Sequence, residues 1–320
     1  MSEPVAGPRI AALGLCSWDR LLVVDTHPTP RQQAIVQQEV TAPGGTTTNT
    51  CVQLARLGAA VTAMTAVGDD PEGEAVLAGL RAEGVDPAWS PVRPGEPTDR
   101  ATVLVTLDPF DRTIIWHPGA TLRKGDRIDI YALFAHDVVI LDFTDMPLLR
   151  FLTDLPAHFA PRTRLLGTLN YVADPAIPDR MELALRHDCI VGAEHDLLLL
   201  TGLDDPEAAI SLLQRSMIGS NLRAAAITAG RRGSVIVTAD DRWEIPVYPV
   251  AAVDPTGAGD AYAAGIAWGM ARRWHWPRTG RFASALGALA TRALGAQTSY
   301  ATLPEAESFL RDAGEPGPSA

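Results

Sequence analysis

The sequence predicts an α/β protein whose core is a mainly parallel sheet and which also carries a small β-strand lid. Two observations predict this fold. Over most of the 320 residues, short apolar strands alternate with helical segments, and such alternation builds a parallel sheet. In two places the alternation is interrupted by short segments that interleave β-branched and polar residues, a pattern typical of solvent-facing strands outside a main sheet.

The N-terminal part of the chain begins the core and the lid. Arg9 to Cys16 is a continuous apolar run, the pattern of a buried parallel strand, and Thr50 to Gly58 follows as a short helix that ends at a glycine. The lid strands are expected in two pairs, the second pair around an Asp108-Pro109 turn. The four segments are Leu21–Asp25, Gln33–Thr41, Ala101–Leu107 and Thr113–Trp116.

The rest of the chain supplies the alternating strands and helices of the core. Strands are expected at Val61–Val67, Val138–Asp142, Arg164–Leu169, Cys189–Val191, Ala224–Thr228 and Val235–Ala239. Helices are expected at Pro71–Glu83, Pro147–Leu155, Pro178–His187, Asp196–Thr201, Pro206–Ile218, Ala258–Arg273 and Arg281–Leu294. Because strand and helix alternate in this order, the sheet should be mainly parallel.

Composition and charge exclude several classes of protein. The net charge of −11 and the pI of about 5.1 argue against a general nucleic-acid binder, which needs a cationic surface. No apolar stretch reaches the roughly 20 residues of a membrane span, and the N-terminus lacks the pattern of a secretory signal, so we expect a cytoplasmic protein. The three cysteines are odd in number and far apart, which argues against a disulfide framework and a cysteine zinc site.

Lys124 is the only lysine of the chain, which limits the possible mechanisms. It lies outside any Gly-x-x-x-x-Gly-Lys-Ser/Thr sequence, so a P-loop nucleotide site is excluded. Schiff-base chemistry is disfavoured for the same reason. An anionic ligand must therefore be held by groups other than a lysine.

The segment Asp254-Pro-Thr-Gly-Ala-Gly-Asp260 precedes an Ala-rich helix and predicts an anion-binding site. Gly257 and Gly259 permit a tight turn with bare backbone, and the unpaired amides of a helix N-terminus suit a phosphoryl group. Asp260, in the first turn, can accept a proton from an attacking hydroxyl. The alternative is that Asp260 only caps the helix. A dinucleotide-binding fold is excluded, because Tyr262 stands where its third glycine is required.

This segment resembles the C-terminal signature of the ribokinase-like (PfkB) carbohydrate kinase family, and four further segments agree with that family in order and spacing. They are Gly44-Gly45-Thr-Thr-Thr-Asn49 with Leu54–Gly58 after it, Val67-Gly-Asp-Asp70 with Gly73 after it, Thr228-Ala-Gly230-Arg-Arg-Gly233, and Gly295-Ala-Gln-Thr-Ser299. Single glycine motifs are weak, but five in this order are not expected by chance. The chain is therefore identified as a member of this family.

The resemblance implies a fold and a reaction. It implies a single ribokinase-like kinase domain over residues 1–320, with a three-layer α/β/α core and a lid subdomain from about 17–42 and 97–119. It implies that ATP with Mg²⁺ donates its γ-phosphate to a hydroxymethyl group of a small sugar-like substrate. Asp260 would be the catalytic base, and the amides of Gly257, Ala258 and Gly259 would stabilise the transferring phosphoryl group.

The resemblance also implies the binding residues. Substrate hydroxyls would be bound by Asp19, Gly45 and Asn49. The nucleotide phosphates would be lined by Thr228, Gly230 and Gly233. A monovalent cation such as K⁺ would lie near Asp254, Thr256 and Ser299. A carboxylate accepts from two hydroxyls, and an amide both donates and accepts. Without the family, Asp19 is equally well explained as an exposed turn residue and Asn49 as a helix cap.

The chain departs from the family at the segment Asn-x-x-Glu, which is associated there with magnesium and phosphate. Here it reads Ala193-Glu-His-Asp196, so the asparagine is missing and the carboxylate side chain is shorter. Asp196 can still hold magnesium through a water, because this ion keeps several waters when it binds to protein. Alternatively, Glu194 takes this place, or the site is weak.

We therefore expect an ATP-dependent carbohydrate kinase. Two alternatives stay open: a nucleoside kinase of the same fold, and a catalytically impaired sugar-binding or regulatory protein, which Ala193 and Asp196 motivate. Exposed edges of the lid strands favour a homodimer that pairs through the lids. Arg112, next to the expected lid turn, is within reach of a phosphate on the substrate, although turn arginines are more often merely exposed.

Overall fold

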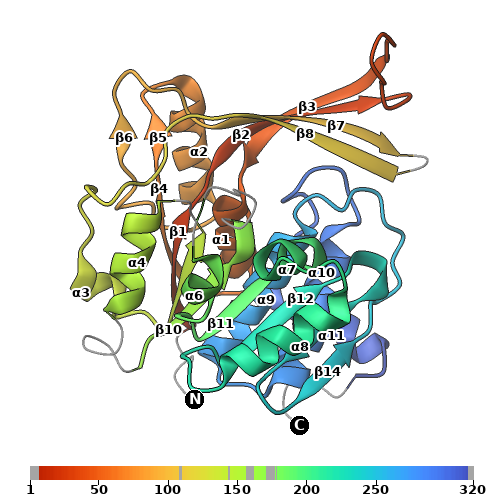
Figure 1. Ribbon diagram of the computed structural model, residues 1–320. Helices are drawn as coiled ribbons and strands as arrows, with labels where there is room; N and C mark the ends of the chain where they lie inside the picture. The colour runs from red at the N-terminus through yellow and green to blue at the C-terminus, as the bar shows by residue number, and fades with distance from the viewer. Residues whose placement is uncertain are drawn as a thin grey trace, which may run out of the picture.

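An eight-stranded sheet runs through the core, with the strand order β14-β13-β12-β11-β10-β9-β1-β4 (Figure 1). The structure, a computed structural model, describes residues 7–107, 110–142, 145–155, 162–170, 177 and 179–315. The strands are β1 (Arg9–Gly14), β4 (Ala60–Thr65), β9 (Val138–Asp142), β10 (Arg164–Thr168), β11 (Cys189–Ala193), β12 (Ala224–Thr228), β13 (Ser234–Val237) and β14 (Arg242–Ile245). The pairings from β4 to β12 are parallel, and β13 and β14 are antiparallel. The predicted mainly parallel sheet is confirmed.

Helices cover both faces of this sheet. One layer consists of α1 (Thr46–Arg56), α9 (Ala258–Ala271), α10 (Trp276–Ala290) and α11 (Leu303–Asp312), with part of α2 (Pro71–Ala82). The other consists of α3 (Ile130–Leu133), α4 (Met146–Asp154), α6 (Arg180–Ala184), α7 (Glu194–Thr201) and α8 (Pro206–Met217). The three-layer α/β/α core is thus confirmed. Among the described residues, none of these helices has both the length and the apolar character that a membrane crossing requires.

Strand β1 shows why its sequence is apolar throughout. Its successive side chains point to opposite faces of the sheet. Ile10 and Ala12 pack against the first helix layer, and Ala11 and Leu13 pack against the second, all of them fully buried. A strand that is covered on both faces has no polar side, which is the pattern that the sequence predicts.

A second sheet of four strands extends from the core above the ends of the core strands (Figure 1). Its order is β3-β2-β7-β8, with β2 (Ser17–Val24), β3 (Val36–Gly44), β7 (Arg100–Leu107) and β8 (Phe110–His117). We call this sheet the lid. The predicted Asp108-Pro109 turn lies outside the described residues. A small parallel pair, β5 (Val67–Gly68) and β6 (Val92–Arg93), lies beside α2.

The Val67–Gly73 motif holds the base of the lid at Thr98, which is fully buried just before β7. The Gly68 N–H donates to Thr98 Oγ1 at 2.9 Å. Asp70 accepts from Thr98 Oγ1 at 2.5 Å and from the Thr98 N–H at 2.8 Å, and it also caps α2 by accepting from the Gly73 N–H. At Gly73, a Cβ would lie only 2.7 Å from Thr98 Oγ1. The motif therefore joins the lid to the core.

The helix expected over residues 50–58 begins four residues earlier, at Thr46. Threonines are poor helix formers, so the sequence alone argues against helix there. In the structure, the hydroxyls of Thr46 and Thr47 donate to Asp142, and Gly45 starts the helix with a positive φ of 89°. A contact that is distant in sequence therefore overrides the local preference.

Two other predicted helices have wrong boundaries. The helix expected at residues 281–294 is α10, which starts at Trp276 because Pro277 occupies a first-turn position where its missing N–H costs nothing. The helix expected at residues 178–187 extends only over Arg180–Ala184, and Pro178 lies outside the described residues. Just beyond the end of this helix, His187 is fully buried, and its side-chain Nδ1 lies 3.0 Å from the Leu183 carbonyl oxygen.

We predict that Thr98→Val lowers the free energy of unfolding by about 1–3 kcal/mol, because it leaves the buried Gly68 N–H and the partly buried Asp70 carboxylate without one hydrogen-bond partner each. Chemical denaturation measures this loss. Thr102→Val is the matched control, since Thr102 is only partly buried and makes a single long contact of 3.5 Å to His117. Equal stability of the two variants would contradict the proposed attachment.

Candidate active site

The carboxyl ends of the parallel strands meet at one edge of the sheet, below the lid. Gly14 at the end of β1 pairs with Asp142 at the end of β9, and Ala193 pairs with Thr228 further along the same edge. The chain leaves β1 for β4 on one side and returns to β9 on the other, so the strand order reverses between β1 and β9. Open α/β sheets bind their ligands at this reversal.

Asp260 lies at this edge, in the first turn of α9. The N-cap of α9 is Gly257, with a φ of 79° and no side-chain cap, so the interpretation of Asp260 as a helix cap is wrong. Its carboxylate instead accepts a hydrogen bond of 2.7 Å from the Asn49 side-chain amide of α1. Two helices far apart in sequence thus meet at this carboxylate.

Burial raises the pKa of Asp260 from 3.8 to about 7. The hydrogen bond from Asn49 lowers the pKa, because it stabilises the charged form. Asp142 and Asp19 raise it by repulsion, and Arg112 lowers it by attraction. A carboxyl group with a pKa near 7 takes and returns protons readily at neutral pH, as a general base requires.

The predicted substrate residues lie beside Asp260. Asp19 is in strand β2, is only 9% exposed and accepts from Ser17 Oγ at 2.5 Å, so it is not an exposed turn residue. Asn49 lies inside α1, is 4% exposed and is therefore not a cap. At Gly45, a Cβ would lie 2.6 Å from the Cys16 backbone, which only glycine avoids at this positive φ. Burial raises the pKa of Asp19, and the Ser17 hydrogen bond lowers it.

Asp142 was not predicted as a site residue, although it is central to the site. It is 3% exposed and accepts from Thr47 Oγ1 at 2.9 Å and Thr168 Oγ1 at 2.5 Å. Thr46 and Asn170 also donate to it. The available signal was a carboxylate that ends the apolar run Val138–Leu141, because strand ends in such sheets face the ligand.

Arg112 of the lid faces the same site. It pairs across the lid with Val105 of β7, which pairs with Val23 of β2. Val23 is four residues after Asp19 on the same strand, and residues an even number apart share a face. Arg112 therefore shares the face of Asp19, in agreement with its effect on the pKa of Asp260.

The loop before α9 offers backbone N–H groups to an anion. The Ala258 N–H donates to the Pro255 carbonyl at 3.1 Å, whereas no acceptor among the described residues takes the N–H of Gly257 or Gly259. Tyr300, fully shielded from solvent at its hydroxyl, donates to the Gly257 carbonyl at 3.0 Å and fixes that peptide. A Cβ on Gly259 would meet open space, so a ligand can approach there.

The predicted nucleotide residues form the turn between β12 and β13. Thr228 ends β12, Gly230 has a φ of 57° and Gly233 a φ of 88°. Next to Gly233, Ser234 accepts a hydrogen bond of 2.9 Å from the Tyr262 hydroxyl of α9. This bond ties the turn to the helix that carries Asp260.

The predicted magnesium residue, Asp196, accepts from the Ala193 N–H at 2.8 Å and so closes the first turn of α7. Burial raises its pKa. Glu194 pairs with Arg232 at 2.6 Å. No group of three or more His, Cys, Asp or Glu side chains that could hold a metal exists among the described residues. The donor set therefore fits an ion that is held mostly by water and phosphate oxygens.

The residues predicted for a monovalent cation join two loops. Asp254 is fully buried and accepts from the N–H and hydroxyl of Thr256 and from the Gly295 N–H. Ser299 donates to the Ala290 carbonyl at 2.7 Å. No ion pair with Asp254 is found in the part of the chain that the structure describes.

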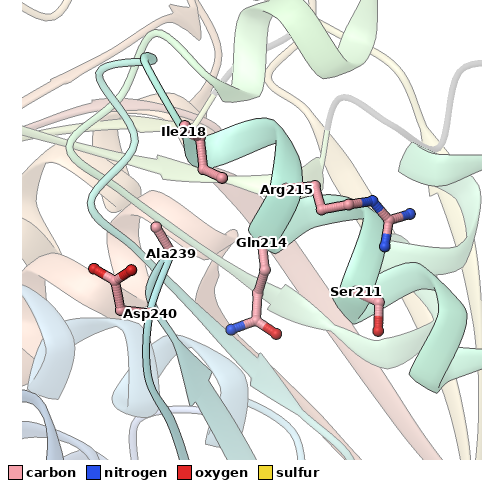
Figure 2. Close-up of a pocket in the computed structure, with 6 residues that line it drawn as sticks. All are labelled: Ser211, Gln214, Arg215, Ile218, Ala239 and Asp240. Carbon is pink, nitrogen blue, oxygen red and sulfur yellow. The ribbon is translucent and has the colours of Figure 1, made fainter.

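A surface hollow of about 370 Å³ lies elsewhere, between α8 and the turn that follows β13 (Figure 2). It is lined by Ser211, Gln214, Arg215, Ile218, Ala239 and Asp240. In strands β12 and β13, the pair Thr228–Ser234 lies at the end next to the candidate site, and the pair Ala225–Val237 lies at the end next to the hollow. The hollow is therefore at the opposite end of the strands from Asp260.

Comparison with known proteins decides the family. The model of the pfkB family carbohydrate kinase matches residues 8–303. The chain belongs to the PfkB family. It is 29% identical to the ribokinase of Bacillus subtilis (strain 168) over 308 residues, which cover 94% of this chain and 99% of the relative. It is 26% identical to a nucleoside kinase of Methanothermobacter thermautotrophicus, over 93% of this chain and 94% of the relative.

Solved structures agree on the fold of this PfkB protein. The ribokinase of Arabidopsis thaliana, complexed with ribose and ATP, matches with a TM-score of 0.78 at 19% identity, over 95% of this chain and 99% of that one. The chain is thus a carbohydrate kinase that phosphorylates an alcohol group, and the family implies that it uses ATP with magnesium.

We predict that Asp260→Asn stabilises the protein at pH 8 by about 2–4 kcal/mol, because it removes a partly buried charge whose folded-state pKa is about 7. The folded wild type holds this proton more tightly than the unfolded chain, so the wild type loses stability as pH rises from about 4 to about 7. The advantage of the variant should grow over that range, stay constant above it and vanish below pH 4.

Denaturation curves at several pH values measure this difference. Asp240→Asn, at an exposed turn residue, controls for the loss of one negative charge from the chain. A constant difference between Asp260→Asn and wild type across pH 4–8 would contradict the raised pKa.

Proposed function

We propose that this PfkB kinase transfers the γ-phosphate of ATP to a hydroxymethyl group of a small neutral sugar, with Asp260 as the base. The observation that carries this proposal is the position of Asp260. This partly buried carboxylate, with a pKa of about 7, accepts from the Asn49 amide and lies in the first turn of α9, next to the open N–H groups of that helix.

The proposed reaction is an in-line transfer. The Asp260 carboxylate accepts the proton of the substrate hydroxyl, whose oxygen attacks the γ-phosphorus while the bond to the ADP oxygen breaks. The N–H groups of Gly257 and Gly259 bind the oxygens of the transferring group. Ala258, whose N–H is bonded to Pro255, contributes to the positive end of the α9 dipole.

The acceptor sugar is proposed to lie between the lid and the strand ends. Asp19 and Asn49 bind its hydroxyls, and the backbone of Gly45, at the start of α1, contacts it. Asp142 lies close to the same groups, because it accepts from Thr47 of α1, the helix that carries Asn49. Carboxylates and amides of this kind suit a neutral molecule with several hydroxyl groups.

ATP is proposed to bind along the turn after β12. Thr228, Gly230 and Gly233 line its phosphates, and positive φ angles at the two glycines bring backbone close to them. Asp196 holds magnesium through a water. This ion, when bound, neutralises charge on the phosphates.

A monovalent cation such as K⁺ is proposed near Asp254, Thr256 and Ser299. A fully buried carboxylate needs a compensating charge, and the partners of Asp254 are neutral donors. A cation at this junction would supply that charge directly behind the loop that holds Gly257.

We also propose a single kinase domain over residues 1–320, with a lid subdomain from about 17–42 and 97–119, in a cytoplasmic protein. The two segments contain β2, β7, β8 and all but the last two residues of β3. The thiols of Cys16, Cys51 and Cys189 are free and buried, which suits a reducing compartment.

We predict that the wild type consumes ATP with magnesium in the presence of a neutral sugar, and that Asp260→Asn lowers kcat by about 10²–10⁴-fold while it still binds ATP. A panel of pentoses, hexoses, hexose phosphates, sugar acids and nucleosides identifies the acceptor. Each assay is run in potassium chloride and in tetramethylammonium chloride, since equal rates would contradict the cation site.

The outcomes separate the alternatives. Turnover with nucleosides alone would make the protein a nucleoside kinase, in line with the archaeal relative. No turnover with any acceptor would favour a binding or regulatory protein. Full activity of Asp260→Asn would contradict its role as the base.

We further propose a homodimer that pairs through the lids. Ile114, Ile115 and Trp116 of the edge strand β8 are 54%, 46% and 55% exposed, as is much of Val36 on the opposite edge. A second copy of the lid would cover these apolar side chains and the open strand edges.

We predict that light scattering gives about twice the chain mass of 34.1 kDa, and that Ile115→Lys shifts the protein toward monomer, because it puts a charge into the apolar contact. Ile218→Lys is the control, because Ile218 is exposed at the end of α8, outside the lid, and this change should leave the mass unchanged. A monomer mass for the wild type would contradict the proposal.

A further inference from the structure

Gln297 lies in the turn between α10 and α11 and is partly buried. Its side-chain nitrogen donates two hydrogen bonds, to the Pro43 carbonyl at 3.2 Å and to Asn49 Oδ1 at 2.9 Å. A backbone carbonyl can only accept, so the Gln297 NH₂ must be the end that faces Pro43. The direction of the Gln297 amide is therefore fixed by the backbone.

This direction is passed on to Asn49. Because the Gln297 NH₂ faces it, Asn49 must present its oxygen to Gln297 and its NH₂ to the other side. On that other side lies Asp260 Oδ2, at 2.7 Å from Asn49 Nδ2. An Asn49 amide turned the other way would place its oxygen against the Asp260 carboxylate and its NH₂ against the NH₂ of Gln297.

We propose that Gln297 is a positioning residue for the phosphoryl transfer, which acts by holding the Asn49 amide with its N–H toward Asp260. The inference rests on the proposed role of Asp260 as the base. Without Gln297, the Asn49 amide is free to turn its oxygen to Asp260, and that orientation favours the protonated carboxyl.

The backbone of Gln297 is held as firmly as its side chain. The Arg56 guanidinium donates to the Gln297 carbonyl at 2.8 Å and to the Tyr300 carbonyl at 3.3 Å. Arg56 is itself paired with Glu83 at 2.7 Å. These bonds hold the turn in place independently of Asn49. Gln297 therefore sets the orientation of the Asn49 amide, and not the reverse.

Other charged groups also act on Asp260, and the Gln297 variant leaves them in place. Asp142 of β9, Asp19 of β2 and Arg112 of β8 act on it through charge, and the buried Tyr300 hydroxyl is close enough for Asp260 to raise its pKa. Gln297 is neutral. A neutral replacement therefore changes the hydrogen bonding around Asp260 without changing the local charge.

The test is Gln297→Met, which keeps the length of the side chain and removes its donors. We expect the midpoint of the Asp260 titration to rise by about 0.5–1 pH unit, the size expected for one hydrogen bond to a charged group. It is measured by carbon NMR of labelled aspartate carboxyls, with the Asp260 resonance assigned by its absence in Asp260→Asn. The acid limb of kcat/KM should shift equally, so that activity is about three- to eightfold lower at pH 6.5 and nearly unchanged at pH 9.

Two further variants isolate the pathway. Thr298→Val, next to Gln297, loses only the bond from its hydroxyl to the Leu294 carbonyl and should leave both titrations unchanged. In an Asn49→Ala background, Gln297→Met should add no further shift of the Asp260 resonance. That non-additivity would show that Gln297 acts through Asn49.

The NMR titration and the pH dependence of kcat/KM test separate claims. An unchanged Asp260 titration in Gln297→Met, or a loss of activity that is equal at every pH, overturns the positioning role and leaves the kinase proposal intact. A shifted Asp260 titration with an unshifted kinetic limb supports the contact to Asp260 but overturns the role of that carboxylate as the base. A shift in both supports the inference.

Discussion

The site depends on the burial of the Asp260 carboxylate. Burying an ionised carboxylate is costly unless donors surround it, and among the described residues Asn49 is the one side chain found to donate to it. Asp142 and Asp19 repel the charge, so the balance leaves a pKa of about 7. With more donors the carboxylate would be too weak a base, and with fewer it would be protonated at neutral pH.

The topology of the sheet explains how these groups come together. Asp142 ends β9, and Asp260 and Asn49 lie near the beginnings of two helices that start at the same edge. The lid adds Asp19 and Arg112 from strands that belong to the separate sheet. The hydrogen bonds of Gly68 and Asp70 to Thr98 hold the base of the lid, from which β7 continues between β2 and β8.

The sequence predicted the elements whose signals are local. Apolar runs identified the core strands, and Gly233 and Gly257 marked turns that do have positive φ angles. Gly259, expected in the same tight turn as Gly257, lies inside α9 and has no positive φ. The sequence missed α11, although Thr302 and Glu305 form a capping box that was readable. It also missed Asp142, whose place at the end of a buried strand was the available signal, and it missed Gln297, because the side chain that Gln297 contacts lies 248 residues away. Contacts at such separations leave no pattern in a single sequence.

The charge of the pocket indicates the kind of substrate that it accepts. Three carboxylates, Asp19, Asp142 and Asp260, act together near the reacting position, and Arg112 is the cation whose field reaches Asp260. A phosphate or carboxylate on the acceptor would face these acids at short range, where repulsion in a partly dry pocket is strong. Neutral hydroxyls instead donate to carboxylates without such a cost. We therefore propose that the same acids that tune the base also select against charged sugars, so that reactivity and specificity arise from one set of side chains.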